Sequence, residues 1–178
     1  MKTAAWTMLA AFAIAVCCAA EELLPKVAGQ GFPALLCATL WFALMRADAA
    51  GKEGVRPVRV PDMLFAVAAG SAEDAVSLLP PVTCATFFPA AAAVCAMLRG
   101  AMRGEEEEAG PFRRFAAYAL ACAAAWACCH LWIWAWLGGE TCGNVFLRAL
   151  AAWPVAAASA AAVHCAFSFA AEKAGLGR

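Results

Sequence analysis

Charged residues are scarce in this chain, and their scarcity excludes most soluble folds. Only 15% of the 178 residues are Asp, Glu, Lys or Arg, whereas 65% are apolar. A soluble domain of this size has about 25% charged and about 45–50% apolar residues. The 13 basic and 13 acidic residues also cancel, so no overall basic field points to nucleic acid as a partner. The composition therefore predicts an integral membrane protein.

Residues and motifs that usually carry catalysis are also few. The chain has two histidines, His130 and His164, and contains no G-x-S-x-G, H-E-x-x-H or P-loop pattern. Its ten cysteines show no C-x-x-C or zinc spacing. Nine of them fall in apolar runs, where cysteine usually serves as a small packing residue. We therefore expect no enzyme, no metal, no cofactor and no small-molecule substrate.

Long apolar runs separate the few charges, and each run is close to the roughly 20 residues that a helix needs to cross a bilayer. The six candidate spans are residues 3–20, 29–45, 61–79, 82–98, 115–137 and 149–171. They predict a single all-α membrane domain over residues 1–178. The second run contains Gly31 and Pro33, and the short fourth run contains Pro89. Five spans plus one re-entrant or tilted segment is therefore the alternative.

The basic residues test this count, because cytoplasmic loops carry an excess of Lys and Arg. With the N-terminus inside, eleven basic residues lie on the cytoplasmic side: Lys2, Arg46, Lys52, Arg56, Arg59, Arg99, Arg103, Arg113, Arg114, Lys173 and Arg178. Only Lys26 and Arg148 lie outside. This asymmetry favours six spans with both termini in the cytoplasm.

The first span also has a second interpretation. Lys2, the apolar stretch after it and Cys18-Ala19-Ala20 before Glu21 have the layout of a secretory signal with a cleavage site. Cleavage there would leave five spans and an external N-terminus.

Two adjacent carboxyl groups, Glu73 and Asp74, lie inside the third apolar run. A charge at bilayer depth costs about 2.5–3.5 kcal/mol on insertion scales. Neighbouring helical residues point about 100° apart, so we expect one carboxyl group to face the bundle interior and the other a protein–protein surface. His130 lies at a comparable depth and is the candidate intramembrane partner of either group. The structural alternative is a carboxyl group bonded to Ser71, Ser77 or the backbone.

The third run carries a further pattern, Gly70-x-x-x-Asp74-x-x-Ser77-x-x-Pro80. It resembles the G-x-x-x-D-x-x-S-x-x-P-x-G signature of the rod shape-determining protein MreD family. Val82 stands where that family usually has glycine, and Glu73 has no counterpart in the signature.

Further matches lie outside the signature. Leu23-Leu24-Pro25 follows the first span, Pro33 opens the second, and Arg99 and Arg103 follow the fourth. Ala34 stands where the family commonly has aspartate. The resemblance covers most of the chain in layout, and residues 65–99 in motif.

The resemblance implies a non-enzymatic subunit of the bacterial cell-elongation machinery in the cytoplasmic (inner) membrane. Such a subunit would bind an MreC-like membrane protein and, through it, help to coordinate peptidoglycan synthesis and cell shape. The implied fold is similar to that of the substrate-binding subunits of energy-coupling-factor transporters. The implied partner-binding or structural residues are Gly70, Asp74, Ser77 and Pro80, to which Glu73 is added as their neighbour.

Two other functions remain open at this point. A substrate-binding subunit for vitamin or small-solute uptake would share the fold and needs a pocket near the outer helix ends, where the tryptophans of the fifth span, Asn144 and Arg148 could line one. A membrane thiol oxidoreductase would use Cys17, Cys18 and Cys142 and needs them accessible.

Overall fold

The structure of the chain is a computed structural model that describes residues 2–24, 31–45, 60–106, 111–138 and 142–173. These residues form six helices and no strand. The helices are α1 (Lys2–Leu23), α2 (Ala34–Met45), α3 (Val60–Val76), α4 (Thr83–Glu106), α5 (Pro111–Leu137) and α6 (Cys142–Lys173). The predicted all-α class is confirmed, and each predicted span corresponds to one helix. The basic loop at 46–59 lies outside the described residues.

Three stretches are long and apolar enough to cross a membrane: Trp6–Leu23, Phe112–Leu137 and Gly143–Lys173. Two others, Ala34–Leu44 and Thr83–Leu98, are apolar but shorter. Pro89 lies inside α4 and does not end it, because neighbouring groups in a membrane bundle can satisfy the carbonyl that proline leaves free. The described residues are therefore all-helical, and their three long apolar helices suggest a membrane protein.

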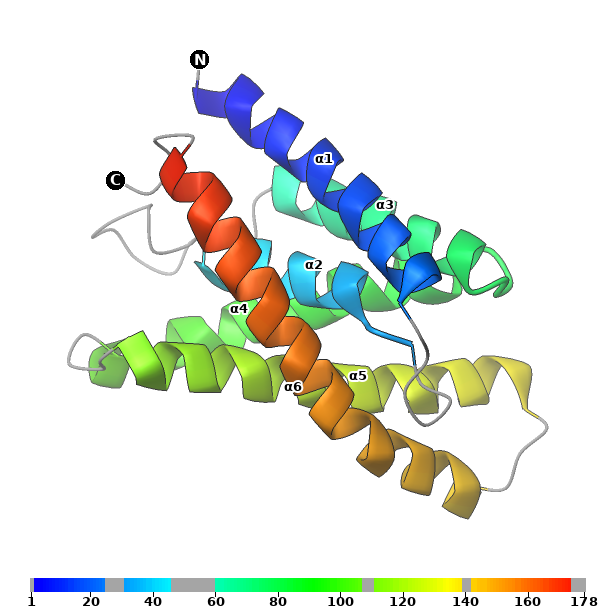
Figure 1. Cartoon of the computed structure of the whole chain (residues 1–178). Helices are drawn as coiled ribbons and strands as arrows, with labels where there is room; N and C mark the ends of the chain where they lie inside the picture. The colour runs from blue at the N-terminus through cyan, green and yellow to red at the C-terminus, as the bar shows by residue number, and fades with distance from the viewer. Residues whose placement is uncertain (1, 25–30, 46–59, 107–110, 139–141, 174–178) are drawn as a thin grey trace.

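The short helix α2 occupies the centre of the bundle and contacts all five other helices (Figure 1). It is apolar on every side, and all its described side chains, from Ala34 to Leu44, are buried. A helix that is hydrophobic all round belongs inside a protein or a membrane. Around it, α3 packs along α4, and α5 packs along α6.

Aromatic side chains from four helices meet near the start of α1. Phe42 of α2 contacts Trp6 of α1, Phe65 of α3 and Phe167 of α6, with ring centroids 6.0, 4.5 and 5.8 Å apart. The starts of α1 and α3 thus lie beside the ends of α2 and α6, as an alternating up-and-down bundle requires. The start of α1 and the end of α6 lie at the same end of the molecule (Figure 1).

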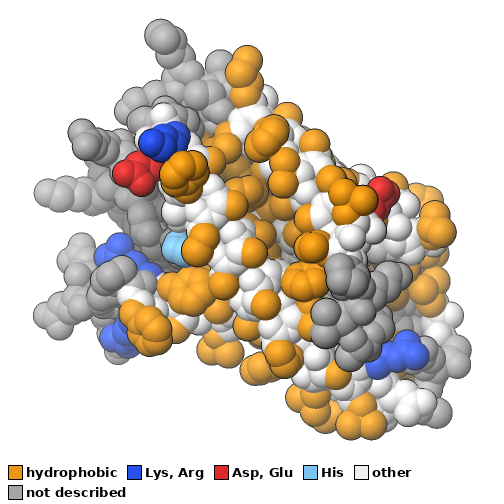
Figure 2. All heavy atoms as spheres, viewed as in Figure 1, with side chains coloured by type: hydrophobic (Ala, Val, Ile, Leu, Met, Phe, Trp, Pro, Cys, Tyr) orange, Lys and Arg blue, Asp and Glu red, His pale blue; other side chains and the backbone are white. Residues whose placement is uncertain are grey.

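The exterior of the bundle is apolar. Met8 and Phe12 of α1 are 74% and 66% exposed, and Phe169 of α6 is 63% exposed. Figure 2 shows hydrophobic side chains spread over this face, with the described charged groups near its margins. In water, such an apolar surface would cause the protein molecules to associate. The acyl chains of a lipid bilayer solvate the same surface without exposing it to water.

Candidate functional site

Asp74 lies near the end of α3 and caps the start of α4. Its Oδ1 accepts a hydrogen bond from the backbone N–H of Cys84 at 2.7 Å, and its Oδ2 accepts one from Ala85 N–H at 3.3 Å. The first N–H groups of a helix have no partner within it and carry partial positive charge, so a carboxylate there is well placed. Asp74 is only 5% exposed, and these bonds give both of its buried oxygens a partner.

Gly70 brings α3 close enough for this cap to form. It lies one helical turn before Asp74 and therefore on the same face of α3. A Cβ atom built at Gly70 would lie 2.4 Å from the carbonyl oxygen of Cys84 and 2.7 Å from the Cα of Ala85. Only glycine allows the two backbones to approach this closely.

The connection between α3 and α4 is a tight turn with two strained residues. The N–H of Leu79 bonds to the carbonyl oxygen of Asp74 at 2.9 Å, and Leu78 has a φ of 53°, which together form a helix end of the Schellman type. At the other end of the turn, Thr83 Oγ1 donates to the carbonyl oxygen of Pro80 at 2.7 Å. Val82 has a φ of 72°, a conformation that favours glycine.

A second carboxyl group, Glu21 of α1, caps α2 in a similar way. Its Oε1 accepts a hydrogen bond from Leu35 N–H at 2.8 Å. Its side chain also lies beside that of Glu73, close enough for the two carboxyl groups to interact. The Oε1 of Glu73 accepts a bond from Ser77 Oγ at 2.7 Å. The ends of α1 and α3 therefore meet through two carboxyl groups, and each helix also carries the cap of the helix that follows it.

The structure corrects two predictions about the adjacent acids. Glu73 and Asp74 do face different partners, but neither lies at a surface, because each is 5% exposed. Neither bonds to His130 among the contacts of the described residues. His130 packs against Trp126 with ring centroids 4.6 Å apart, and its buried Nε2 has no hydrogen-bond partner. Where the imidazole of His130 was predicted, Asp74 has the backbone of α4 as its partner. Glu73 has Glu21 as its neighbour.

His164 serves a structural role between helices. Its Nδ1 accepts a hydrogen bond from Trp41 Nε1 at 3.3 Å, and its ring lies 5.3 Å from that of Phe115 and 6.0 Å from that of Tyr118. These contacts tie α6 to α2 and α5, as expected for an imidazole that links membrane helices.

The cysteines of the described residues behave mainly as packing groups. Cys17, Cys37, Cys84, Cys122 and Cys129 are buried, and all nine described cysteines are free thiols. No group of three or more His, Cys, Asp or Glu side chains in the described part of the chain could hold a metal ion. Cys142, one of three residues of the thiol hypothesis, has no described side chain.

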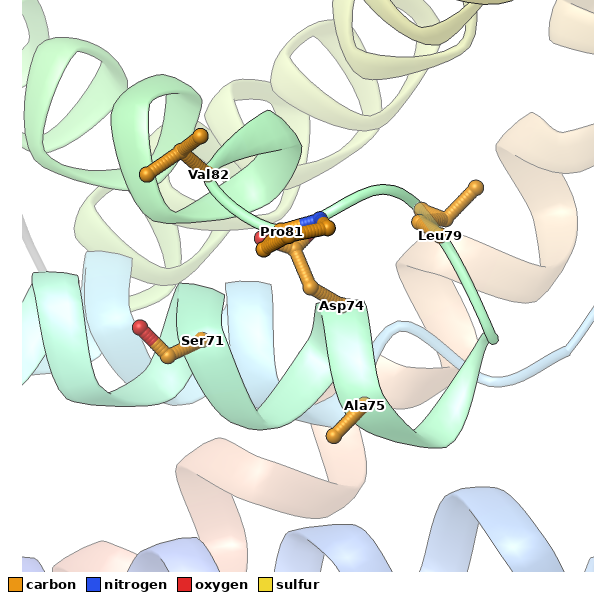
Figure 3. Close-up of a pocket in the computed structure, with 6 residues that line it drawn as sticks. All are labelled: Ser71, Asp74, Ala75, Leu79, Pro81 and Val82. Carbon is orange, nitrogen blue, oxygen red and sulfur yellow. The ribbon is translucent and has the colours of Figure 1, made fainter.

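A hollow of about 280 Å³ lies against the α3–α4 turn. It is lined by Ser71, Asp74, Ala75, Leu79, Pro81 and Val82. Figure 3 shows these side chains, with Asp74 extending from α3 toward the segment that carries Pro81 and Val82. Four of the six lining residues are exposed, so the hollow opens at the surface of the bundle. It is large enough for one side chain of another protein.

Sequence reasoning did not single out Glu21, although a signal for it was present. In an alternating bundle the end of the first helix and the end of the third lie at the same level. Glu21 and Glu73 each stand near such an end, so their juxtaposition follows from topology once the helices are placed. Which faces of the two helices meet depends on packing.

Comparison of the chain with protein-family models, with curated proteins and with solved structures finds no match. The likeness to the MreD family therefore rests on the residues of the signature and on the layout described above.

Proposed function

We propose that this chain is a non-enzymatic, MreD-like subunit of the bacterial cell-elongation machinery. In this proposal it binds an MreC-like membrane protein and thereby contributes to cell shape and to the coordination of peptidoglycan synthesis. It lies in the inner membrane with six transmembrane helices and both termini in the cytoplasm. Its fold is similar to that of the substrate-binding subunits of energy-coupling-factor transporters.

The observation that carries the proposal is the shared location of the signature residues. Gly70 lets the start of α4 approach α3 closely, and Asp74 caps that start. Ser77 donates a hydrogen bond to Glu73, and the carbonyl oxygen of Pro80 accepts one from Thr83. Together these residues build one hairpin end, and the open hollow lies directly against it. A rigid hairpin that shapes a surface hollow is suited to holding a partner, and it needs no substrate.

This arrangement separates the role of the signature residues from that of their neighbours on α3. Gly70 and Asp74 act within the protein, because their contacts are with α4. Ser71 and Ala75 lie on exposed parts of α3 and line the hollow, so in this proposal they contact the partner. A test of partner binding should therefore change the second group and leave the cap intact.

The first experiment is purification of the tagged protein from native membranes in mild detergent, with mass spectrometry of the proteins that accompany it. We expect an MreC-like protein among them. Recovery of paired ATPases with a coupling membrane subunit would contradict the proposal and make the chain a solute-uptake subunit instead.

Ala75→Trp then tests whether the hollow is the docking surface. The indole would fill the hollow without removing the oxygens of Asp74, so we expect normal amounts of protein in the membrane and loss of the accompanying MreC-like protein. The control is Ala157→Trp, at an exposed position of α6, which should retain it. Retention of the partner by Ala75→Trp would exclude the hollow.

A further inference from the structure

We propose that Glu21 and Glu73 form a proton-binding pair that holds a single proton between the two carboxyl groups and links the starts of α2 and α4. This inference does not depend on the proposed function, because it rests on contacts within the bundle.

The pair is built from two oxygens that lack conventional donors. Glu73 is 5% exposed, its Oε1 is occupied by Ser77, and its Oε2 is buried without a hydrogen-bond partner. The Oε1 of Glu21 is occupied by Leu35 N–H, and its Oε2 is likewise buried and unpartnered. The two carboxyl groups lie close enough to interact directly. Two carboxylates are acceptors only, so a hydrogen bond between these groups requires one proton.

The surroundings of the pair favour a proton over a charged counter-ion. The titratable groups that act on it are Cys17 and Cys18 from α1, Cys37 from α2 and Cys84 from α4, beside the neighbouring Asp74. None of these described groups supplies positive charge; Lys26, which follows Glu21 in the sequence, lies outside the described residues. Calcium or magnesium would require about six oxygen ligands, and in the described residues no third acidic, His or Cys side chain joins the pair in a metal site.

Release of the proton would affect two helices together. The proton would pass to a water molecule or buffer base and leave two carboxylates in contact, which repel each other strongly when buried. Glu21 also caps α2, and Glu73 directly precedes Asp74, which caps α4. Separation of the two carboxylates would therefore loosen the starts of both helices.

Infrared spectroscopy of the full-length protein in detergent tests for the proton directly. We expect a carbonyl stretching band from one protonated carboxyl group at neutral pH, and we expect it to disappear on titration to alkaline pH. Glu73→Gln and Glu21→Gln should each remove the band. The control Glu22→Gln, at an exposed residue of the same helix, should leave it. Absence of the band, or its persistence in both single variants, would overturn the proposal.

Thermal unfolding against pH gives a second readout that does not depend on the band. Glutamine at position 73 can still accept from Ser77 and also provides a permanent donor to Glu21, so this variant should fold. The wild-type midpoint should fall as pH rises through the release of the proton, whereas the Glu73→Gln midpoint should not show that fall. Equal falls in both proteins, or a fall reversed by adding sodium or calcium ions, would contradict a shared proton.

Discussion

Val82 is a branched residue in a backbone conformation that suits glycine. Its φ of 72° costs about 1–2 kcal/mol for an L-residue with a Cβ atom. Its side chain is 56% exposed, so little buried contact would be lost on removing it. The MreD-family signature that this segment resembles has glycine at this position, and the strain gives that preference a physical reason.

We therefore expect Val82→Gly to stabilise the protein by about 0.5–1 kcal/mol, after allowance for the greater freedom of glycine in the unfolded chain. Thermal unfolding in mild detergent measures the change. The matched control is Val94→Gly, at a comparably exposed residue inside α4, the helix that begins just after Val82, which should lose about 1 kcal/mol. Destabilisation by Val82→Gly would show that the residue is not strained.

Asp74 contributes to stability through the hydrogen bonds that it accepts from two backbone N–H groups. Asp74→Ala would leave both groups buried without a partner, and we expect a loss of about 1–3 kcal/mol, the range for a buried polar group left unsatisfied. Asp74→Asn retains one acceptor oxygen and should lose less. Thermal unfolding of the two variants provides the ranking, and an alanine variant as stable as the wild type would contradict the capping role.

At the scale of elements, the α3–α4 pair depends on one close backbone contact. Gly70→Ala would place a methyl group against the carbonyl of Cys84, and a backbone atom cannot move aside as a flexible side chain can. We expect a loss of about 1–3 kcal/mol as the helices separate, together with weakening of the Asp74 cap. The measurement is again the unfolding midpoint in detergent.

The control for this variant is Gly143→Ala in α6. No atom lies within 4 Å of a Cβ built there, so alanine should be neutral or slightly stabilising through its higher helix propensity. A Gly70→Ala protein as stable as the control would mean that α3 and α4 do not pack this closely.

The helices of this chain could be predicted more fully than their ends or their contacts. Apolar runs located all six, because burial in lipid selects apolar residues along the whole helix. The run at 149–171 nevertheless missed the first turns of α6, which begins at Cys142, since helical hydrogen bonding continues through polar residues that hydropathy excludes. The caps by Glu21 and Asp74 could not be predicted, because each depends on which faces of two helices meet.

At the scale of the whole molecule, the alternating arrangement of the helices predicts the orientation of the chain. The start of α1 and the end of α6 lie at one end of the bundle, and in the proposed topology, which follows the positive-inside asymmetry, that end faces the cytoplasm. A green fluorescent protein fused after residue 178 should therefore fluoresce, whereas alkaline phosphatase fused there should be inactive. The reverse result would contradict the proposed topology.

An N-terminal epitope tag on the same fusion tests the first helix. If α1 is a retained helix, the tag and the C-terminal reporter should remain on one polypeptide. Glu21 bonds to the backbone of α2, and Ala13 of α1 is fully buried, so we expect retention. Separation of tag and reporter by a signal peptidase would contradict it.

Synthesis on the ribosome delivers α2 before four of the five helices that enclose it. At 1.5 Å per residue its 12 residues extend about 18 Å, less than the roughly 30 Å of a hydrocarbon core. Its neighbours α5 and α6 are made after α3 and α4. Until then a nascent chain can hold α2 only against α1, α3 and α4. Fragments that stop before α5 leave the α5- and α6-facing sides of this short helix uncovered, so membrane proteases should clear them faster than longer chains.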